Sequence, residues 1–248
     1  MPIQNAIEVR NVTKGFRTRA IETMALRGVD FEVRSGEAVF LVGPSGSGKT
    51  TLLSIMGCLL RPSSGRVRIA GQDVTELTER KLPDVRLRNI GFVFQSFNLF
   101  PNLTAEENLR LALDLKGIAG STARKRAAGL REAVGLEEVR SRFPSDLSRN
   151  QKQRVAIARA LAADAPIILA DEPTAALDFR NEASIMRLLC DLAHSRQRAV
   201  VVVTHDRRVM EYADRIVQIE DGRIADAPVL PPEPSAERLR RNYREVCI

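Results

Sequence analysis

Residues 43–50 read G-P-S-G-S-G-K-T and carry the clearest chemical signal in this 248-residue chain. Their spacing matches the phosphate-binding loop G-x-x-x-x-G-K-[ST], in which backbone N–H groups surround a polyphosphate. In such a loop Lys49 reaches the terminal phosphates and the Thr50 hydroxyl binds Mg²⁺. The sequence therefore predicts a nucleoside triphosphate site in preference to a Gly/Ser-rich turn that binds nothing. The residues expected to contact the nucleotide here are Gly43, Pro44, Ser45, Gly46, Ser47, Gly48, Lys49, Thr50 and Thr51.

The segments on either side of this loop suit the same role. Residues 38–42 form a short apolar run typical of a buried strand, and residues 51–60 can continue as a helix. A helix that starts directly after the loop points its unpaired N–H groups and positive dipole end at the phosphates.

Three further polar residues follow apolar runs. Asp171 and Glu172 come directly after residues 167–170, and His205 follows residues 199–203 through Thr204. Ligands of open α/β folds bind at the carboxyl ends of the strands. We expect Asp171 to hold Mg²⁺, directly or through water, and Glu172 to orient and deprotonate the water that attacks the γ-phosphate. His205 is expected to hydrogen-bond that phosphate; the alternative for the acids is a pair of solvated loop side chains.

The wider pattern of strands and helices predicts one α/β domain. Residues 7–33 indicate an antiparallel layer, residues 66–69 and 91–94 indicate strands, and residues 216–224 indicate a hairpin. Helical periodicity runs from about 97 to 163, where Thr104 and Glu107 form a capping-box pair. We expect a domain over residues 1–226, with this helical part inserted, and a Pro-rich, basic tail over 227–248 that either docks a partner or packs on its own domain.

Composition narrows the class of protein. The net charge of +7 is compatible with nucleic acid, an anionic membrane surface or a solvated basic face. Aromatic residues make up only 4% of the chain and form no row of stacking platforms, which argues against nucleic-acid binding. No apolar run reaches the roughly 18–20 residues that span a bilayer, so we expect a soluble, cytosolic protein.

The phosphate loop, the two acids and His205 follow one another along the chain as in the ATP-binding subunit of an ABC transporter. The chain resembles that family over residues 7 to about 224. The resemblance implies the ABC ATPase fold: a P-loop NTPase core with a parallel sheet, an N-terminal antiparallel β subdomain and an inserted α-helical subdomain. It also implies that the protein binds ATP and Mg²⁺, hydrolyses ATP and sits peripherally on the cytoplasmic face of the membrane. Residues 57–65, 90–108 and 151–161 look like the lipoprotein-release and macrolide-export branch.

The resemblance also assigns residues that spacing alone does not. By it, Phe16 stacks on adenine, and Gln95 contacts Mg²⁺ or the attacking water and relays ATP occupancy to a separate integral membrane permease. Two ATP-binding subunits would face each other head to tail, with Ser148 and Gln151 of one subunit on the ATP of the other. Asp178 would couple the two sites.

The chain departs from the family pattern at the signature segment, which reads L-S-R-N-Q where the family has L-S-G-G-Q. A side chain at Arg149 is expected to crowd the approach to the partner's γ-phosphate, unless its guanidinium supplies charge there or points to solvent. Asn150 is the milder change, because Asn tolerates a left-handed backbone. We therefore predict slow turnover; the alternative function is an ATP-gated clamp with little hydrolysis that acts on cell-envelope machinery.

Overall fold

The computed structural model describes residues 5–17, 22–162, 164–175, 177 and 179–225. Two sheets form its framework: an antiparallel sheet in the order β2-β1-β4-β5 and a central sheet in the order β10-β9-β3-β8-β7-β6. The strands of the antiparallel sheet are β1 (Asn5–Arg17), β2 (Glu22–Arg34), β4 (Ser64–Ile69) and β5 (Gln72–Asp73). The strands of the central sheet are β3 (Ala38–Val42), β6 (Ile90–Val93), β7 (Ile167–Asp171), β8 (Ala199–Val203), β9 (Arg215–Glu220) and β10 (Arg223–Ile224).

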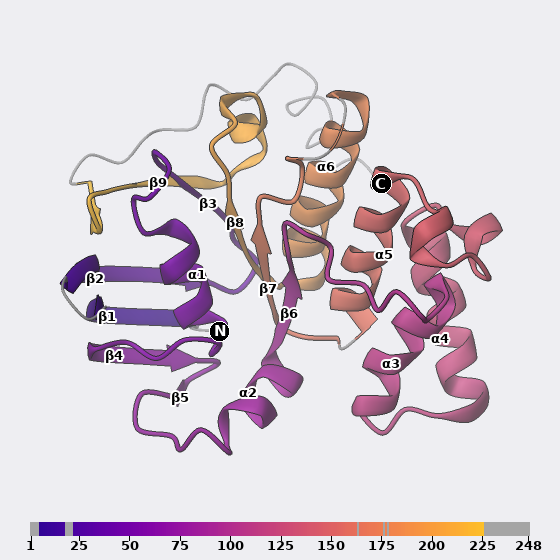
Figure 1. Cartoon of the computed structure of the whole chain (residues 1–248), viewed down its shortest axis with the longest axis horizontal. Coiled ribbons are helices and arrows are strands. Elements are labelled where there is room, and N and C mark those ends of the chain that lie inside the picture. Colours follow the sequence, from indigo (N-terminus) through magenta and orange to yellow (C-terminus); the bar gives the residue numbers. More distant parts are fainter. Residues whose placement is uncertain (1–4, 18–21, 163, 176, 178, 226–248) are drawn as a thin grey trace, which may run out of the picture.

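Helices cover the central sheet. They are α1 (Lys49–Met56), α2 (Leu82–Asn89), α3 (Ala105–Leu115), α4 (Gly120–Ala133), α5 (Arg149–Ala162) and α6 (Phe179–Arg196), with 3-10 turns η1 (Glu137–Val139), η2 (Pro144–Asp146) and η3 (Arg207–Tyr212). Figure 1 shows the antiparallel sheet on one side of the molecule and α3, α4 and α5 on the other, with the central sheet between them. Among the described residues, no helix is long and apolar enough to cross a bilayer.

The central sheet confirms the strands expected from continuous apolar runs. Every residue of β3 and β8 is buried, as expected for parallel strands covered on both faces. Strands β6, β7, β8, β3 and β9 all run parallel, and only the short β10 pairs antiparallel with its neighbour. Their carboxyl ends therefore meet at one edge of the sheet.

Helix α1 lies between the two sheets. It buries Leu52, Leu53, Ile55 and Met56 in a core shared by the central and antiparallel sheets. The expectation that it continues to residue 60 is wrong. Gly57 caps the helix at its carboxyl end, and Cys58 then takes a left-handed backbone with φ 53°, which ends the helical path.

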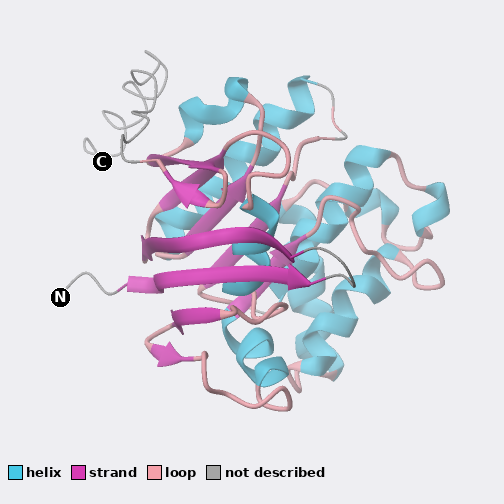
Figure 2. Cartoon of the chain, turned by 60° about the vertical axis from the view of Figure 1, so that its left-hand side comes forward, coloured by secondary structure: helices cyan, strands magenta, loops and turns pink. Residues whose placement is uncertain are grey.

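The helices expected between residues 97 and 163 are present and pack around an apolar cluster of their own, which includes Leu109 and Leu113 of α3. Thr104 caps α3, and the reciprocal bonds with Glu107 form the expected capping box. Helix α5 contributes to two apolar clusters. Val155 packs among the helices, and Ile157 packs against the central sheet. Figure 2 shows this helical part beside the sheets.

Candidate functional site

The phosphate loop lies between β3 and α1, at the carboxyl edge of the central sheet. Strand pairing sets Leu41 of β3 opposite Val203 of β8, and Val203 opposite Asp171 of β7. Three segments thus leave the sheet side by side: the loop after β3, the segment of His205 after β8 and the acids at the end of β7. The sheet itself brings together the groups that the sequence predicts at strand ends.

Two glycines let the loop pass through a narrow space. A Cβ on Gly43 would lie 2.1 Å from the carbonyl oxygen of Ile219, and one on Gly48 would lie 2.6 Å from that of Ala25. Both glycines also have positive φ, 152° and 106°. The turn after β9 supports the loop from outside, because the Gly222 N–H donates to the Ser47 carbonyl over 3.0 Å.

Lys49, the first residue of α1, is almost fully buried, with 7% of its surface exposed. Its Nζ donates to the carbonyl oxygens of Gly43 and Pro44 over 2.8 and 2.7 Å. Burial lowers the pKa of this ammonium, while the Glu172 and Asp171 carboxylates act in the opposite direction. The Lys49 Nζ therefore sits beneath the loop, where a phosphate can replace its carbonyl partners.

The loop also fits a ligand rich in oxygen. The Ser47 Oγ is buried and, among the described residues, has no hydrogen-bond partner, and such orphan groups are rare in native interiors. The first N–H groups of α1 have no acceptor within the helix. A polyphosphate at this place accepts from both.

A hydroxyl and a carboxylate offer a position for Mg²⁺. The Thr50 Oγ1 donates to the Asp171 Oδ1 over 3.3 Å, and burial raises the pKa of Asp171, while that hydrogen bond acts against the rise. In the described part of the chain, no three His, Cys, Asp or Glu side chains form a metal site. The donor set still fits Mg²⁺, which is commonly held by one or two carboxylates together with substrate phosphates and water.

Glu172 and His205 form a pair at the same edge. The distance from Glu172 Oε1 to His205 Nδ1 is 2.7 Å, and the Glu172 side chain is 15% exposed whereas that of His205 is 69% exposed. The Glu172 backbone is left-handed, with φ 47°, and its N–H donates to the Val203 carbonyl over 2.9 Å. A sheltered carboxylate thus meets an exposed imidazole beside Lys49.

Gln95 lies two residues beyond β6, at the same edge of the sheet, and is exposed. The segment that follows it is held from α5, because the Arg159 guanidinium donates to the carbonyl oxygens of Phe97 and Asn98 over 3.0 and 2.5 Å. Both of those residues have a left-handed backbone. The position of Gln95 suits its expected contact with the metal or water, which stays a prediction.

Ser148 and Gln151 are not part of this cluster. They lie at the start of α5, on the other side of the central sheet from α1 (Figure 1). Their side chains bond reciprocally, since Gln151 N–H donates to Ser148 Oγ over 3.2 Å and Ser148 N–H donates to Gln151 Oε1 over 2.9 Å. Within one chain these two residues cap a helix, so a role on a nucleotide needs a second subunit.

Arg149 and Asn150 both begin α5 in helical backbone, and neither has a positive φ. The tolerance of Asn for a left-handed backbone is therefore not used, and that expectation is corrected. Asn150 Oδ1 accepts from Arg154 Nε over 2.9 Å, and the same guanidinium donates to the Val134 carbonyl and the Ser184 Oγ. Arg149 is exposed and has an ordinary helical backbone. Its predicted effect at the partner's γ-phosphate therefore depends on the bulk and charge of its side chain.

The expected contact of Phe16 with adenine comes from the antiparallel sheet and not from the strand ends of the central sheet. Phe16, near the end of β1, is 44% exposed, and the Lys14 Nζ lies 5.3 Å from its ring centroid. An exposed ring of this kind can stack on a base, and the contact of Phe16 with adenine stays a prediction. Asp178 lies outside the described residues, and its role stays a prediction.

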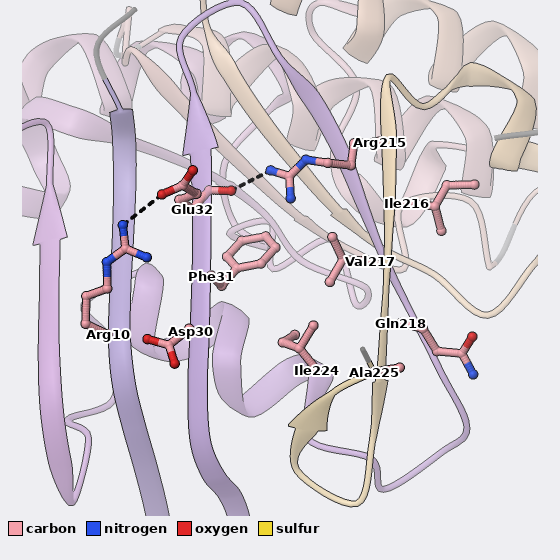
Figure 3. Close-up of a pocket in the computed structure, with 10 residues that line it drawn as sticks. All are labelled: Arg10, Asp30, Phe31, Glu32, Arg215, Ile216, Val217, Gln218, Ile224 and Ala225. Atoms are coloured by element: carbon pink, nitrogen blue, oxygen red, sulfur yellow. Dashed lines mark hydrogen bonds and ion pairs between the residues drawn. The ribbon is translucent and has the colours of Figure 1, made fainter. Parts of the chain in front are cut away.

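A separate hollow of about 270 Å³ lies beside β2 and β9 (Figure 3). Its cations are already paired, Arg10 with Glu32 and Arg215 with Glu37. None of the phosphate-loop or strand-end residues lines it. It offers no free charge for a phosphate, and we place the nucleotide site at the loop instead.

Comparison with known proteins gives one consistent result. A family model described as "ABC transporter" matches residues 26–175. An uncharacterized ABC transporter ATP-binding protein of Thermotoga maritima is 47% identical over 222 residues, which is 90% of this chain and 94% of that protein. The macrolide export ATP-binding/permease protein MacB of Hyphomonas neptunium is 44% identical, but its match takes in 88% of this chain and only 34% of MacB.

A solved structure is similar over most of this chain. It is titled a dimeric post-hydrolysis state of the ATP-binding cassette MJ0796 bound to ADP and Pi, and the corresponding protein of Methanocaldococcus jannaschii is described as an uncharacterized ABC transporter ATP-binding protein. The structural match has a TM-score of 0.86 and 43% identity, and covers 91% of this chain and 99% of that one.

Proposed function

This chain belongs to the ATP-binding family of ABC transporters, and we propose from that premise that it powers a separate membrane permease. The protein is an ATPase of that family. The finer proposal is that two copies bind two ATP molecules between them and that hydrolysis drives export or extrusion from the membrane. The similarity to MacB supports the direction of transport. In this proposal the permease determines which substrate is transported.

The observation that carries the proposal is the meeting of Lys49, Glu172 and His205 at one edge of the central sheet. Lys49 and the N–H groups of α1 bind and neutralise the phosphates. Glu172 accepts a proton from the attacking water, and His205, whose Nδ1 lies 2.7 Å from Glu172 Oε1, hydrogen-bonds the γ-phosphate. Thr50 and Asp171 would hold Mg²⁺, which supplies charge neutralisation on the phosphate oxygens.

The remaining assignments complete a two-subunit site. We propose that Phe16 stacks on adenine, that Gln95 contacts the metal or water, and that Ser148 and Gln151 face the partner's ATP, with Asp178 coupling the two sites. We also propose a domain over residues 1–226, with its helical part at about 97–163, and a tail over 227–248. In this arrangement the protein sits on the cytoplasmic face of the membrane, bound to its permease.

The test uses two variants of the full chain. Glu172→Gln is expected to lower kcat by about a hundredfold or more while ATP still binds, because the amide keeps the shape of the side chain but cannot accept the proton. Lys49→Ala is expected to abolish binding of a fluorescent ATP analogue. Full turnover by Glu172→Gln, or unchanged nucleotide binding by Lys49→Ala, contradicts the assignment.

The signature segment supports a slower enzyme or, as a second function, an ATP-gated clamp. The exposed Arg149 would stand where two subunits meet over ATP. We propose that turnover is slow and that the double change Arg149→Gly, Asn150→Gly raises it in the complex with the permease. A clamp differs in that it binds ATP tightly and shows negligible hydrolysis with or without the permease, so ATPase assays in both states separate the two functions.

A further inference from the structure

The hollow beside β2 and β9 lies between the outer edges of two sheets. β2 is the outermost strand of the antiparallel sheet, and among the described residues β9 is followed on its outer side only by the two-residue strand β10. Figure 3 shows Phe31 of β2 facing Val217 of β9 and Ile224 of β10 across the hollow. Edge strands leave backbone N–H and C=O groups without a strand partner, so the space between two edges fits one more extended segment.

The described chain ends at this hollow. Ala225, its last residue, lines the hollow, and its N–H donates to the carbonyl oxygen of Gln218 over 2.9 Å. That bond carries the pairing of β10 with β9 one residue further, in the register that sets Ile224 opposite Ile219. Residues 226–248 follow and lie outside the described residues. An extended continuation of β10 would therefore run along β9, beside the residues that line the hollow.

The register fixes which backbone groups of this continuation would face β9. In an antiparallel ladder, pairs of residues that exchange hydrogen bonds alternate with pairs that do not. The bond from Ala225 to Gln218 makes theirs a bonded pair. The next bonded pair, two residues further along each strand, is then Ala227 with Ile216. The backbone groups of Ile216 therefore point away from β3 toward the added segment, whereas those of Val217 point to β3.

Proline falls at a place in this register where it removes no hydrogen bond. Pro228 stands opposite Arg215 in a non-bonded pair, so the side of its backbone that lacks an N–H would face away from β9. The Arg215 side chain also closes this end of the hollow, because its Nη2 donates to the Glu32 carbonyl oxygen over 2.6 Å. Of two adjacent prolines one always falls at a bonding position, so Pro231 and Pro232 would end any such ladder.

We propose that residues 226–228 extend β10 along β9 and occupy the hollow between β9 and β2. The segment begins at the wall of the hollow, so no linker has to span a gap before it. The first part of the C-terminal tail thus packs on its own domain, and a docking partner would meet only the residues beyond the prolines. This proposal is independent of the proposed ATPase function.

NMR of the full chain tests the pairing through contacts between protons of facing strands. In a non-bonded pair of an antiparallel ladder the two Cα atoms lie only about 4.5 Å apart, so their α-protons give a strong nuclear Overhauser effect. We expect this signal between Asp226 and Val217 in the wild-type protein. The described pair of Ile224 and Ile219 gives the same kind of signal and is the internal reference.

Two changes of alanine to proline separate the register from a general effect on the tail. Ala227→Pro removes the N–H that would donate to Ile216 and sets a ring against β9, so the signal between Asp226 and Val217 is expected to be lost. Ala236→Pro makes the same change beyond the prolines and is expected to leave that signal in place. The reference signal is expected to stay in both variants.

A missing signal between Asp226 and Val217 in the wild type overturns the proposal. So does a signal that survives in Ala227→Pro or is lost equally in Ala236→Pro. In a sample that mixes isotopically labelled and unlabelled chains, a signal between the two kinds of chain would identify a second copy as the source of the added strand, which also overturns it. ATPase activity enters none of these measurements, so the proposed function and this proposal can fail separately.

Discussion

At the scale of single residues, Gly43 and Gly46 offer a matched test of the loop. A Cβ on Gly43 meets the Ile219 carbonyl at 2.1 Å, whereas one on Gly46 meets nothing within 4 Å. Gly43→Ala is therefore expected to lower the free energy of unfolding by about 3 kcal/mol through overpacking. Gly46→Ala, with φ 80°, is expected to cost about 1 kcal/mol for the left-handed backbone alone.

Urea denaturation without nucleotide measures both variants, so that effects on ATP binding do not enter. Equal stability of the two proteins would mean that the contact with β9 does not set the path of the loop.

The residues of the site differ in how far the sequence predicts them. Asp171, Glu172 and His205 were predicted because each ends an apolar run, and parallel strands bring such ends to one edge. The support of the segment after Gln95 had no such signal, since Arg159, which donates to the carbonyl oxygens of Phe97 and Asn98, lies 62 and 61 residues away from them along the chain.

At the scale of elements, the cap of α3 carries a pH dependence. Bonds from the Thr104 backbone and hydroxyl lower the pKa of Glu107. A carboxyl group whose pKa is lower in the folded than in the unfolded protein stabilises the folded state when the pH is above the pKa of the unfolded protein, about 4.5. This stabilisation is lost as the pH falls through the pKa of the folded protein.

We therefore expect Glu107→Gln to be less stable than the wild type at pH 7 and to approach it as the pH falls below about 4.5. Thermal denaturation between pH 7 and about pH 3 measures the difference. Glu132→Gln, on α4, caps no helix and serves as the control; a difference that does not change with pH would contradict the assignment.

The first turn of α5 contains Asn150, where the signature segment departs from the family pattern, and this residue also contributes to the stability of the fold. Asn150 accepts from Arg154, which also holds the end of α4 and Ser184 of α6. Asn150→Gly removes this bond and places glycine inside a helix, and we expect it to cost about 1 kcal/mol. Asn150→Ala keeps helix propensity and is expected to cost less, as urea titrations of both variants would show. Equal losses would mean that helix propensity plays no part.

The elements were predicted where the pattern was strong. Strands β3, β7 and β8 are continuous apolar runs, and α3 has an explicit cap. Helix α2 was missed because it buries only Leu82 and Val85 and carries Pro83 in its first turn. The end of α1 was misplaced because Leu59 and Leu60 continue its apolar run, although the backbone at Cys58 has already left the helix.

At the scale of the whole molecule, the proposed dimer places Arg149 at the partner's ATP. Arg149→Glu would set a negative side chain against the phosphates, and we expect it to weaken the MgATP-dependent dimer by at least about tenfold. Sedimentation in the Glu172→Gln background measures this without turnover. Arg124→Glu, exposed on α4, makes the same change of charge elsewhere and is expected to leave the dimer intact; equal effects of the two would contradict the placement.

The burial of α1 between two sheets has a consequence for exchange with deuterium. The amide hydrogens of its buried residues Leu52, Leu53, Ile55 and Met56 reach solvent only when the sheets move away, so they are expected to exchange as slowly as global unfolding allows. The loop before it, with Pro44, Ser45 and Gly46 exposed, reaches solvent directly. A nucleotide can therefore leave and return many times while the helix beneath it never opens.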